Sequence, residues 1–124
     1  LVSAEVASEK RMGRVIAKFP QKPSGMTYEG YLVFERQGKG SRVTVRFPES
    51  GTTGVRDIAV MMLWMKKPPE GPDPFAGWTA DPYDAARRDP LMRNVADGES
   101  YDVKFPEHPL TLVRTEMKTI EESL

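Results

Sequence analysis

The most regular alternation of apolar and polar residues lies between residues 41 and 47. The order along the chain is Ser41, Arg42, Val43, Thr44, Val45, Arg46 and Phe47. A repeat of two is typical of a strand with one buried face. The apolar segment 28–37 precedes it, and the Gly-Lys-Gly sequence at 38–40 tolerates the positive φ angles of a tight turn. The pattern therefore predicts a β-hairpin of two strands, 28–37 and 41–47.

Three segments end in the same way, with a basic residue, Phe and Pro in succession. They are 15–23, 43–51 and 101–109. We expect the Phe to be the last inward residue of a strand and the basic residue to face solvent. Proline ends the strand because it has no N–H to donate. This pattern predicts strands at 14–19 and 101–105, and 110–118 reads as one more. A ring of basic residues that binds phosphates is the alternative interpretation.

Segment 55–67 is apolar at nearly every position. As a strand it would be apolar on both faces, and as a helix it would bury nearly its whole circumference. Periodicity does not separate these two structures in a continuous apolar run. Unbranched Met and Leu favour a helix, whereas the neighbouring strands favour a strand. We expect a central strand, with a helix as the alternative.

Residues 67–90 contain many prolines, at positions 68, 69, 72, 74, 82 and 90. Such a segment is expected to run extended outside the sheet. Within it, 81–89 predicts a short helix, with Asp81 as N-cap and Pro82 in the first turn. Residues 94–100 predict a turn.

Together these elements predict a mainly β (α+β) fold in a single domain, 1–124. We expect a small antiparallel barrel or sandwich of five or six strands with one or two short helices and a proline-rich excursion. The expected parts are an N-terminal arm or short helix (1–13), a β-hairpin core (14–66), a proline-rich arm with a short helix (67–98), C-terminal strands (99–118) and a tail (119–124).

The composition excludes several kinds of chemistry and describes the distribution of charge. The 124 residues include no Cys, which excludes disulfides and thiolate chemistry. Lysine plus arginine balance aspartate plus glutamate at 18 each, but residues 1–67 carry a charge of +6 and 68–124 a charge of −6. No apolar run approaches the roughly 20 residues of a membrane span, so a soluble protein is expected. The start at Leu1 fits a cleaved targeting segment or a trimmed start equally well, and the compartment stays open.

An enzyme is the least expected class. His108 is the single histidine, and it stands in the tight sequence Glu107–Pro109 with no nucleophile beside it. We expect a surface turn histidine. The Gly-rich segment 49–54 lacks the spacing of a phosphate-binding loop. No cofactor and no metal ion are therefore expected.

Three aromatic residues in the proline-rich arm suggest a partner-binding role. Phe75, Trp78 and Tyr83 are large rings on a segment that does not join the sheet. Interface hot spots are enriched in Trp and Tyr, and a stiff segment loses less entropy when it docks. The leading hypothesis is a non-catalytic structural or adaptor subunit that binds protein partners in a larger assembly. In the alternative interpretation, these rings fold back over the chain's own core.

Two other functions stay open. The first is a small nucleic-acid-binding β-barrel that uses a basic hairpin face. Its candidate residues are Arg36, Arg42, Arg46, Tyr28 and Tyr31. The second is an inhibitor or immunity-type protein, which would differ from an adaptor only in the identity of its partner.

Overall fold

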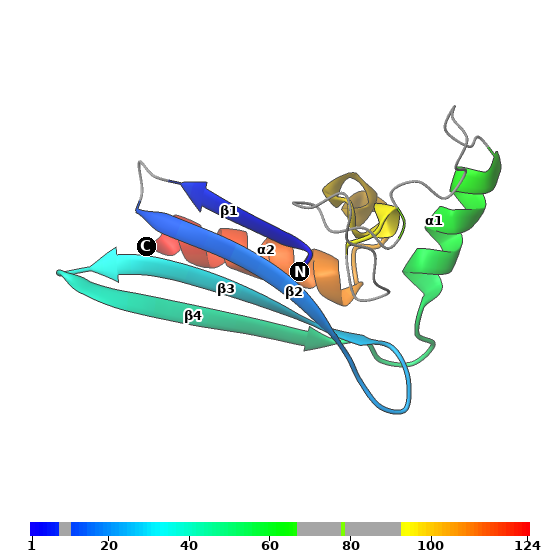
Figure 1. Cartoon of the computed structure of the whole chain (residues 1–124), viewed down its shortest axis with the longest axis horizontal. Helices are drawn as coiled ribbons and strands as arrows, with labels where there is room; N and C mark the ends of the chain where they lie inside the picture. The colour runs from blue at the N-terminus through cyan, green and yellow to red at the C-terminus, as the bar shows by residue number, and fades with distance from the viewer. Residues whose placement is uncertain (8–10, 67–77, 79–92) are drawn as a thin grey trace.

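The computed structural model describes residues 1–7, 11–66, 78 and 93–124. Its centre is one antiparallel sheet with strands in sequence order (Figure 1). The strands are β1 (Ser3–Ala7), β2 (Met12–Pro20), β3 (Met26–Arg36) and β4 (Lys39–Pro48). The helices are α1 (Val55–Lys66), the 3₁₀ segments η2 (Val95–Asp97) and η3 (Glu99–Lys104), and α2 (Pro109–Ser123). None of the helices in these ranges is long and apolar enough to cross a membrane.

The hairpin of β3 and β4 confirms the prediction from the alternating pattern. Arg36 pairs with Lys39, so the connection is the two residues Gln37 and Gly38. Their φ angles are +53° and +72°. Positive φ at both central residues is the turn geometry that matches the twist of paired strands. Both strands are longer than the sequence predicted.

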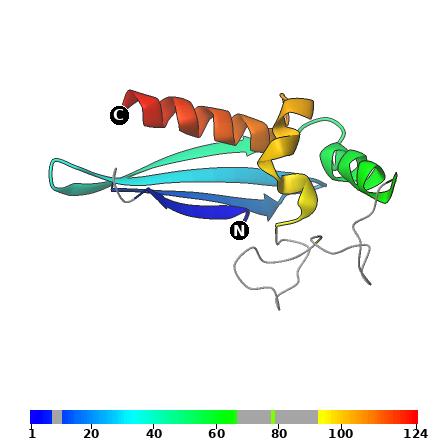
Figure 2. The same cartoon turned by 90° about the horizontal axis from the view of Figure 1, so that it is seen from above.

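Helix α2 covers one face of the sheet (Figure 2). Gly30 of β3 permits this close packing, because a Cβ atom built there would lie 2.7 Å from Cγ1 of Val113. The buried core beneath the helix combines residues of the sheet, of α2 and of the N-terminus. It consists of Val2, Ala7, Met12, Ile16, Tyr28, Leu32, Val45, Leu110, Val113 and Met117.

A second, smaller core lies where α1 meets η2, beyond one end of the sheet (Figure 1). It is built from Val60, Trp78 and Ala96. The rings of Trp64 and Trp78 meet edge to face, with centroids 6.4 Å apart. Among the described residues, helix α1 packs against η2 through the side that carries Val60 and Trp64.

The predicted barrel or sandwich of five or six strands is wrong in its closure and strand count. The described chain forms an open sheet of four strands. Residues 3–7 form strand β1 rather than part of a helix, because they pair with Met12–Ile16 of β2. Pairing with a neighbouring strand outweighs the weak helical preference of such a short segment.

The C-terminal strands are also wrong. Residues 101–104 belong to η3, and 109–123 form one helix that includes most of the expected tail. The side chain of His108 accepts a hydrogen bond from the N–H of Leu110, and Pro109 occupies the first helical position. Both features start helices. Leu110, Val113 and Met117 then follow helical spacing on the buried side.

Segment 55–66 is a helix, so the expected central strand is wrong. Gly54, with φ of +75°, precedes its first residue. Arg56, Val60 and Trp64 recur every four residues along the side that meets η2, as helical geometry requires. The helical preference of Met and Leu agrees with the structure of this segment.

The repeated Phe-Pro ending has mixed outcomes. Pro20 and Pro48 are the last residues of β2 and β4, as predicted. In β4 the basic residue faces solvent, but in β2 the pattern is reversed. Phe19 is 45% exposed and Lys18 is only 5% exposed. The expected helix 81–89 and most of the proline-rich segment lie outside the described residues.

Candidate functional site

A buried ion pair explains the reversed pattern of β2. Nζ of Lys18 lies 2.7 Å from Oδ2 of Asp97, and both side chains are at most 3% exposed. The same Asp97 oxygen accepts the backbone N–H of Asn94, which closes the capping box of η2. The pair therefore joins η2 to the sheet. A buried charge needs such a partner, because its desolvation costs several kcal/mol.

Arg56 makes a second set of buried polar contacts at the first turn of α1. Its Nε donates to the carbonyl of Ala96 at 2.7 Å, and its Nη1 donates to Oγ1 of Thr111 at 3.1 Å. Its Nη2 donates to Oδ1 of Asp102 at 2.9 Å. Arg114 of α2 donates to the same Asp102 oxygen. The guanidinium thus fastens α1 to η2, η3 and α2, which is a structural role.

His108 is a helix cap rather than the expected surface turn residue. Its Nδ1 accepts from Leu110, its Nε2 lies 4.0 Å from Oε2 of Glu49, and its ring meets the edge of Tyr28 at 5.2 Å. Burial, with a smaller contribution from the charge of Arg56, lowers the pKa of His108 to about 4. Its Nδ1 is occupied by the helix cap, and its side chain, 11% exposed, lines a surface pocket with Glu49 and Phe105.

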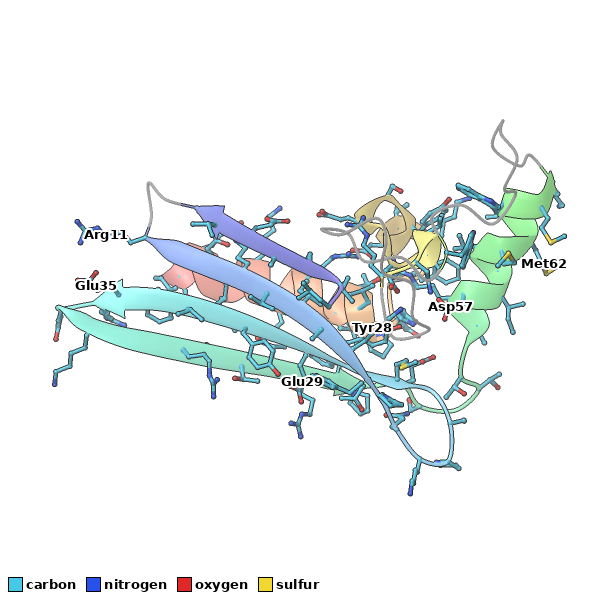
Figure 3. The ribbon with its side chains drawn as sticks, in the orientation of Figure 1. Arg11, Tyr28, Glu29, Glu35, Asp57 and Met62 are labelled. Carbon is cyan, nitrogen blue, oxygen red and sulfur yellow. The ribbon has the colours of Figure 1, made fainter. Side chains whose placement is uncertain are left out.

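Two more titratable groups lie near this junction, Tyr28 on β3 and Asp57 on α1 (Figure 3). Burial raises the pKa of Tyr28, and the Asp97 carboxylate adds to the effect. Burial also raises the pKa of Asp57, again with a contribution from Asp97. In the described ranges no three His, Asp or Glu side chains are grouped as a metal site requires. We call the region where α1 and η2 meet the end of the sheet the junction. Its polar side chains form a network of contacts within the chain.

The strongest candidate for a functional surface is the side of α1 that faces away from η2. Its exposed apolar residues follow the spacing of three and four, and we call them the outer side of α1. They are Val55 (48% exposed), Ile58 (62%), Met62 (62%) and Met65 (62%), with Leu63 (41%) at the margin. Figure 3 labels Met62 on this helix. Large apolar patches on a protein surface often mark interaction sites.

Of the three aromatic residues predicted to bind a partner, the structure describes only Trp78. Trp78 is 7% exposed and belongs to the core between α1 and η2. In this structure its ring packs inside the chain. Phe75 and Tyr83 lie outside the described residues, so their partner-binding role stays a prediction.

The five candidates for nucleic-acid binding divide between two faces of the sheet. Tyr31, Arg42 and Arg46 lie on the face opposite α2, which we call the outer sheet face. The guanidinium of Arg42 lies 5.7 Å from the centroid of the Tyr31 ring. Tyr28 is buried on the α2 face, and Arg36 shares its strand face with Tyr28 and lines a pocket with Glu121 of α2. Three of the five are thus brought together.

The outer side of α1 was missed at the sequence level, although its signal is present. Positions 55, 58, 62 and 65 show the spacing of a helix-packing seam. The spacing was overlooked because the whole segment is an uninterrupted apolar run.

Compared with known proteins, the chain matches no family model, no curated protein and no solved structure. Functional arguments for it therefore start from its own residues.

Proposed function

We propose that the protein is a non-catalytic binding subunit whose outer side of α1 docks against an apolar, acid-flanked helix of another protein. The observation that carries this proposal is the exposed stripe of Ile58, Met62 and Met65, each 62% exposed. An inhibitor or immunity-type protein would use the same surface, and only its target would differ.

The distribution of apolar residues around α1 supports the proposal. A helix that is apolar on all sides is normally buried on all sides. Helix α1 buries Val60 on one side and exposes Ile58 and Met62 on the other. Covering a side chain that is 62% exposed contributes roughly 1–2 kcal/mol before the costs of association are subtracted. A partner helix with knobs at matching spacing would cover the stripe.

The charges of α1 favour a different protein over a second copy. Of its three charged residues, Arg56 is buried, Asp57 is partly buried and Lys66 is exposed at the C-terminal end. Two parallel copies would place one Lys66 beside the other. Two antiparallel copies would place each Lys66 against the positive N-terminal end of the opposite helix. A carboxylate on a different helix complements Lys66 instead.

The non-catalytic part of the proposal is supported by the polar junction. Arg56 and His108 make contacts within the chain, and Oδ2 of Asp97 pairs with Lys18, although Oδ1 of Asp97 has no hydrogen-bond partner among the described residues. A catalytic constellation needs a base within reach of a nucleophile in an open site. His108, the most plausible base by residue type, instead caps α2.

A synthetic peptide tests the proposal. The probe is an amphipathic helix of about three heptads with Leu and Ile at its seam and Glu at its flanks. We expect it to bind the unmodified protein, and Ile58→Glu with Met62→Glu to weaken binding at least about tenfold. The control is Val103→Glu on η3, where the residue is 82% exposed and is not part of the outer side of α1.

Three results would contradict the proposal. The peptide could bind the α1 variant as tightly as the unmodified protein. A peptide with Lys in place of Glu could bind equally well, which would remove the role of Lys66. The protein could instead form a dimer that the α1 substitutions abolish, in which case the occupant is a second copy.

A further inference from the structure

We infer that the outer sheet face binds single-stranded nucleic acid. This surface is separate from α1, so the inference does not depend on the proposed function. Its members point away from α2 on alternate positions of the four strands. They include Val6, Val15, Ala17, Phe19, Tyr31, Val33, Arg42 and Arg46.

Strand pairing places the apolar and aromatic residues of this face on β1, β2 and β3, beside the two arginines of β4. We call these apolar and aromatic residues the apolar floor. Val15 of β2 lies opposite Tyr31 of β3, and Tyr31 lies opposite Thr44 of β4. In the next row outward, Val33 lies opposite Arg42. Val6 is 83% exposed and Val33 is 47% exposed, so the floor is open. An antiparallel sheet usually presents polar residues on its solvent face, so an apolar floor is unusual.

The floor includes two aromatic rings on which bases can stack. Phe19, near the end of β2, is 45% exposed. Tyr31 is partly exposed and carries the Arg42 guanidinium over its ring at 5.7 Å. Bases stack on aromatic rings and on guanidinium planes, and this stacking tolerates any base. Phe19 stands four residues along β2 from the partner of Tyr31, about 13 Å away, so the two rings would hold different bases.

The charges of the face favour a phosphate backbone along β4. The acidic Glu29 is only 8% exposed, and it lies 2.5 Å from Nη2 of Arg46 and accepts a hydrogen bond from the Tyr31 hydroxyl. The hydrogen bond from Tyr31 lowers the pKa of Glu29, so the carboxylate remains charged and compensated. Within the described residues Arg42 has no carboxylate partner. Glu35, on the same face near the β3–β4 turn, is 48% exposed and lies 3.5 Å from Arg11. A ligand along Arg42 and Arg46 would therefore meet arginine nitrogens and would reach an exposed carboxylate only at the turn.

The open sheet favours single strands over a duplex. The described face offers no helix to enter a major groove, and its stacking rings require unpaired bases. A second copy is the other occupant that would cover apolar residues on a sheet. The arginines along β4 make a negatively charged ligand the better match, and self-association is treated below as an opposing outcome.

The test is binding of fluorescent oligothymidylate and oligouridylate of about 20 nucleotides, followed by anisotropy. If about three phosphates are contacted, affinity should fall roughly 20-fold between about 50 mM and about 200 mM salt. Arg42→Ala with Arg46→Ala should weaken binding at least about tenfold and lower the salt slope by about 1.4. Arg36→Ala, which removes a charge from the opposite face, should change affinity less than about twofold.

A second pair of variants isolates stacking from charge. Tyr31→Phe should retain binding, whereas Tyr31→Ala should weaken it about fivefold or more at both salt concentrations. Ile58→Glu with Met62→Glu on α1 should leave oligonucleotide affinity nearly unchanged, which separates this inference from the proposed function.

Clear results would overturn the inference. One is the absence of salt-dependent binding by the unmodified protein. Another is an equal loss for Arg36→Ala and for Arg42→Ala, since net charge alone would then explain binding. A third is a dimer that dissociates on Val33→Asp, because the outer sheet face would then be covered by a second copy.

Discussion

The two cores of this chain are held together by different physical means. Between the sheet and α2, apolar side chains interlock, and Gly30 lets the helix approach the strand. At the junction of α1 and η2, the apolar cluster formed by the described residues is small, and Arg56 adds four hydrogen bonds to the attachment. Because one side of α1 is fastened by polar contacts, the other side does not need to be buried in the chain. The difference explains how an apolar helix comes to present a free surface.

The largest expected loss of stability comes from removing the buried side chain of Arg56. Arg56 is 2% exposed, and Arg56→Ala removes the donor to the carbonyls of Ala96 and Gly98 and leaves Asp102 with Arg114 as its partner. We expect a loss of about 3–5 kcal/mol in the stability of the junction, because two buried carbonyls lose their donor and the large side chain leaves a cavity. Hydrogen exchange should become faster in α1 than in α2. Equal acceleration in both helices would mean that the two cores unfold as one unit.

The next largest effect is a pH dependence at His108. Burial lowers the pKa of this histidine to about 4 in the folded state, from an ordinary value near 6.5. The unfolded state therefore binds a proton first as pH falls. The contribution of His108 is complete above about pH 6.5 and is lost between about pH 6.5 and pH 4, at a cost on the order of 3 kcal/mol.

Urea unfolding across this pH range measures the effect, with His108→Asn as the comparison. Asparagine still caps a helix but does not titrate in this range. The pH dependence of the variant should be flatter than that of the unmodified protein. Identical slopes would contradict the assignment, since Glu49, Asp97 and Asp102 also face the ring.

A smaller effect is expected within the closely packed core. Gly30→Ala would place a methyl group 2.7 Å from Cγ1 of Val113, and overpacking of this kind costs typically about 1–3 kcal/mol. Gly40→Ala on β4 is the matched control, since a Cβ there meets no atom within 4 Å. Thermal unfolding of the two variants compares them directly. Equal melting temperatures would show that α2 is not held as tightly as its packing implies.

The smallest effect is expected on the outer side of α1. Ile58→Glu and Met62→Glu alter side chains that are each 62% exposed. Stability should change by no more than about 0.5 kcal/mol, as for surface substitutions in general. Chemical denaturation of the variants measures this value. A loss above about 2 kcal/mol would mean that these side chains support the fold.

The sequence predicted the parts of the fold that local pattern controls. Alternation in 41–47 and a flexible connection were sufficient for the β3–β4 hairpin, and Pro20 and Pro48 marked two strand ends. The helices were harder because their caps involve residues outside the repeating pattern. His108 starts α2 through a side-chain hydrogen bond, which alternation does not reveal.

The candidate sites were harder to predict than the fold. The burial of Lys18 depends on Asp97, which lies 79 positions away in the chain. No local pattern at residue 18 contains that information. Likewise, Tyr28 and Tyr31 both lie on β3, but an odd spacing places them on opposite faces once the strand is known. The outer side of α1 could be predicted from the sequence once segment 55–67 was taken as a helix rather than a strand.

The most direct test of the central claim is hydrogen exchange of the unmodified protein with and without the Glu-flanked helical peptide. If the outer side of α1 is a docking surface, amide protection should increase in residues 55–66 and remain unchanged in 109–123. The Ile58→Glu, Met62→Glu variant should show no increase. Protection that appears elsewhere, or that persists in the variant, would contradict the claim.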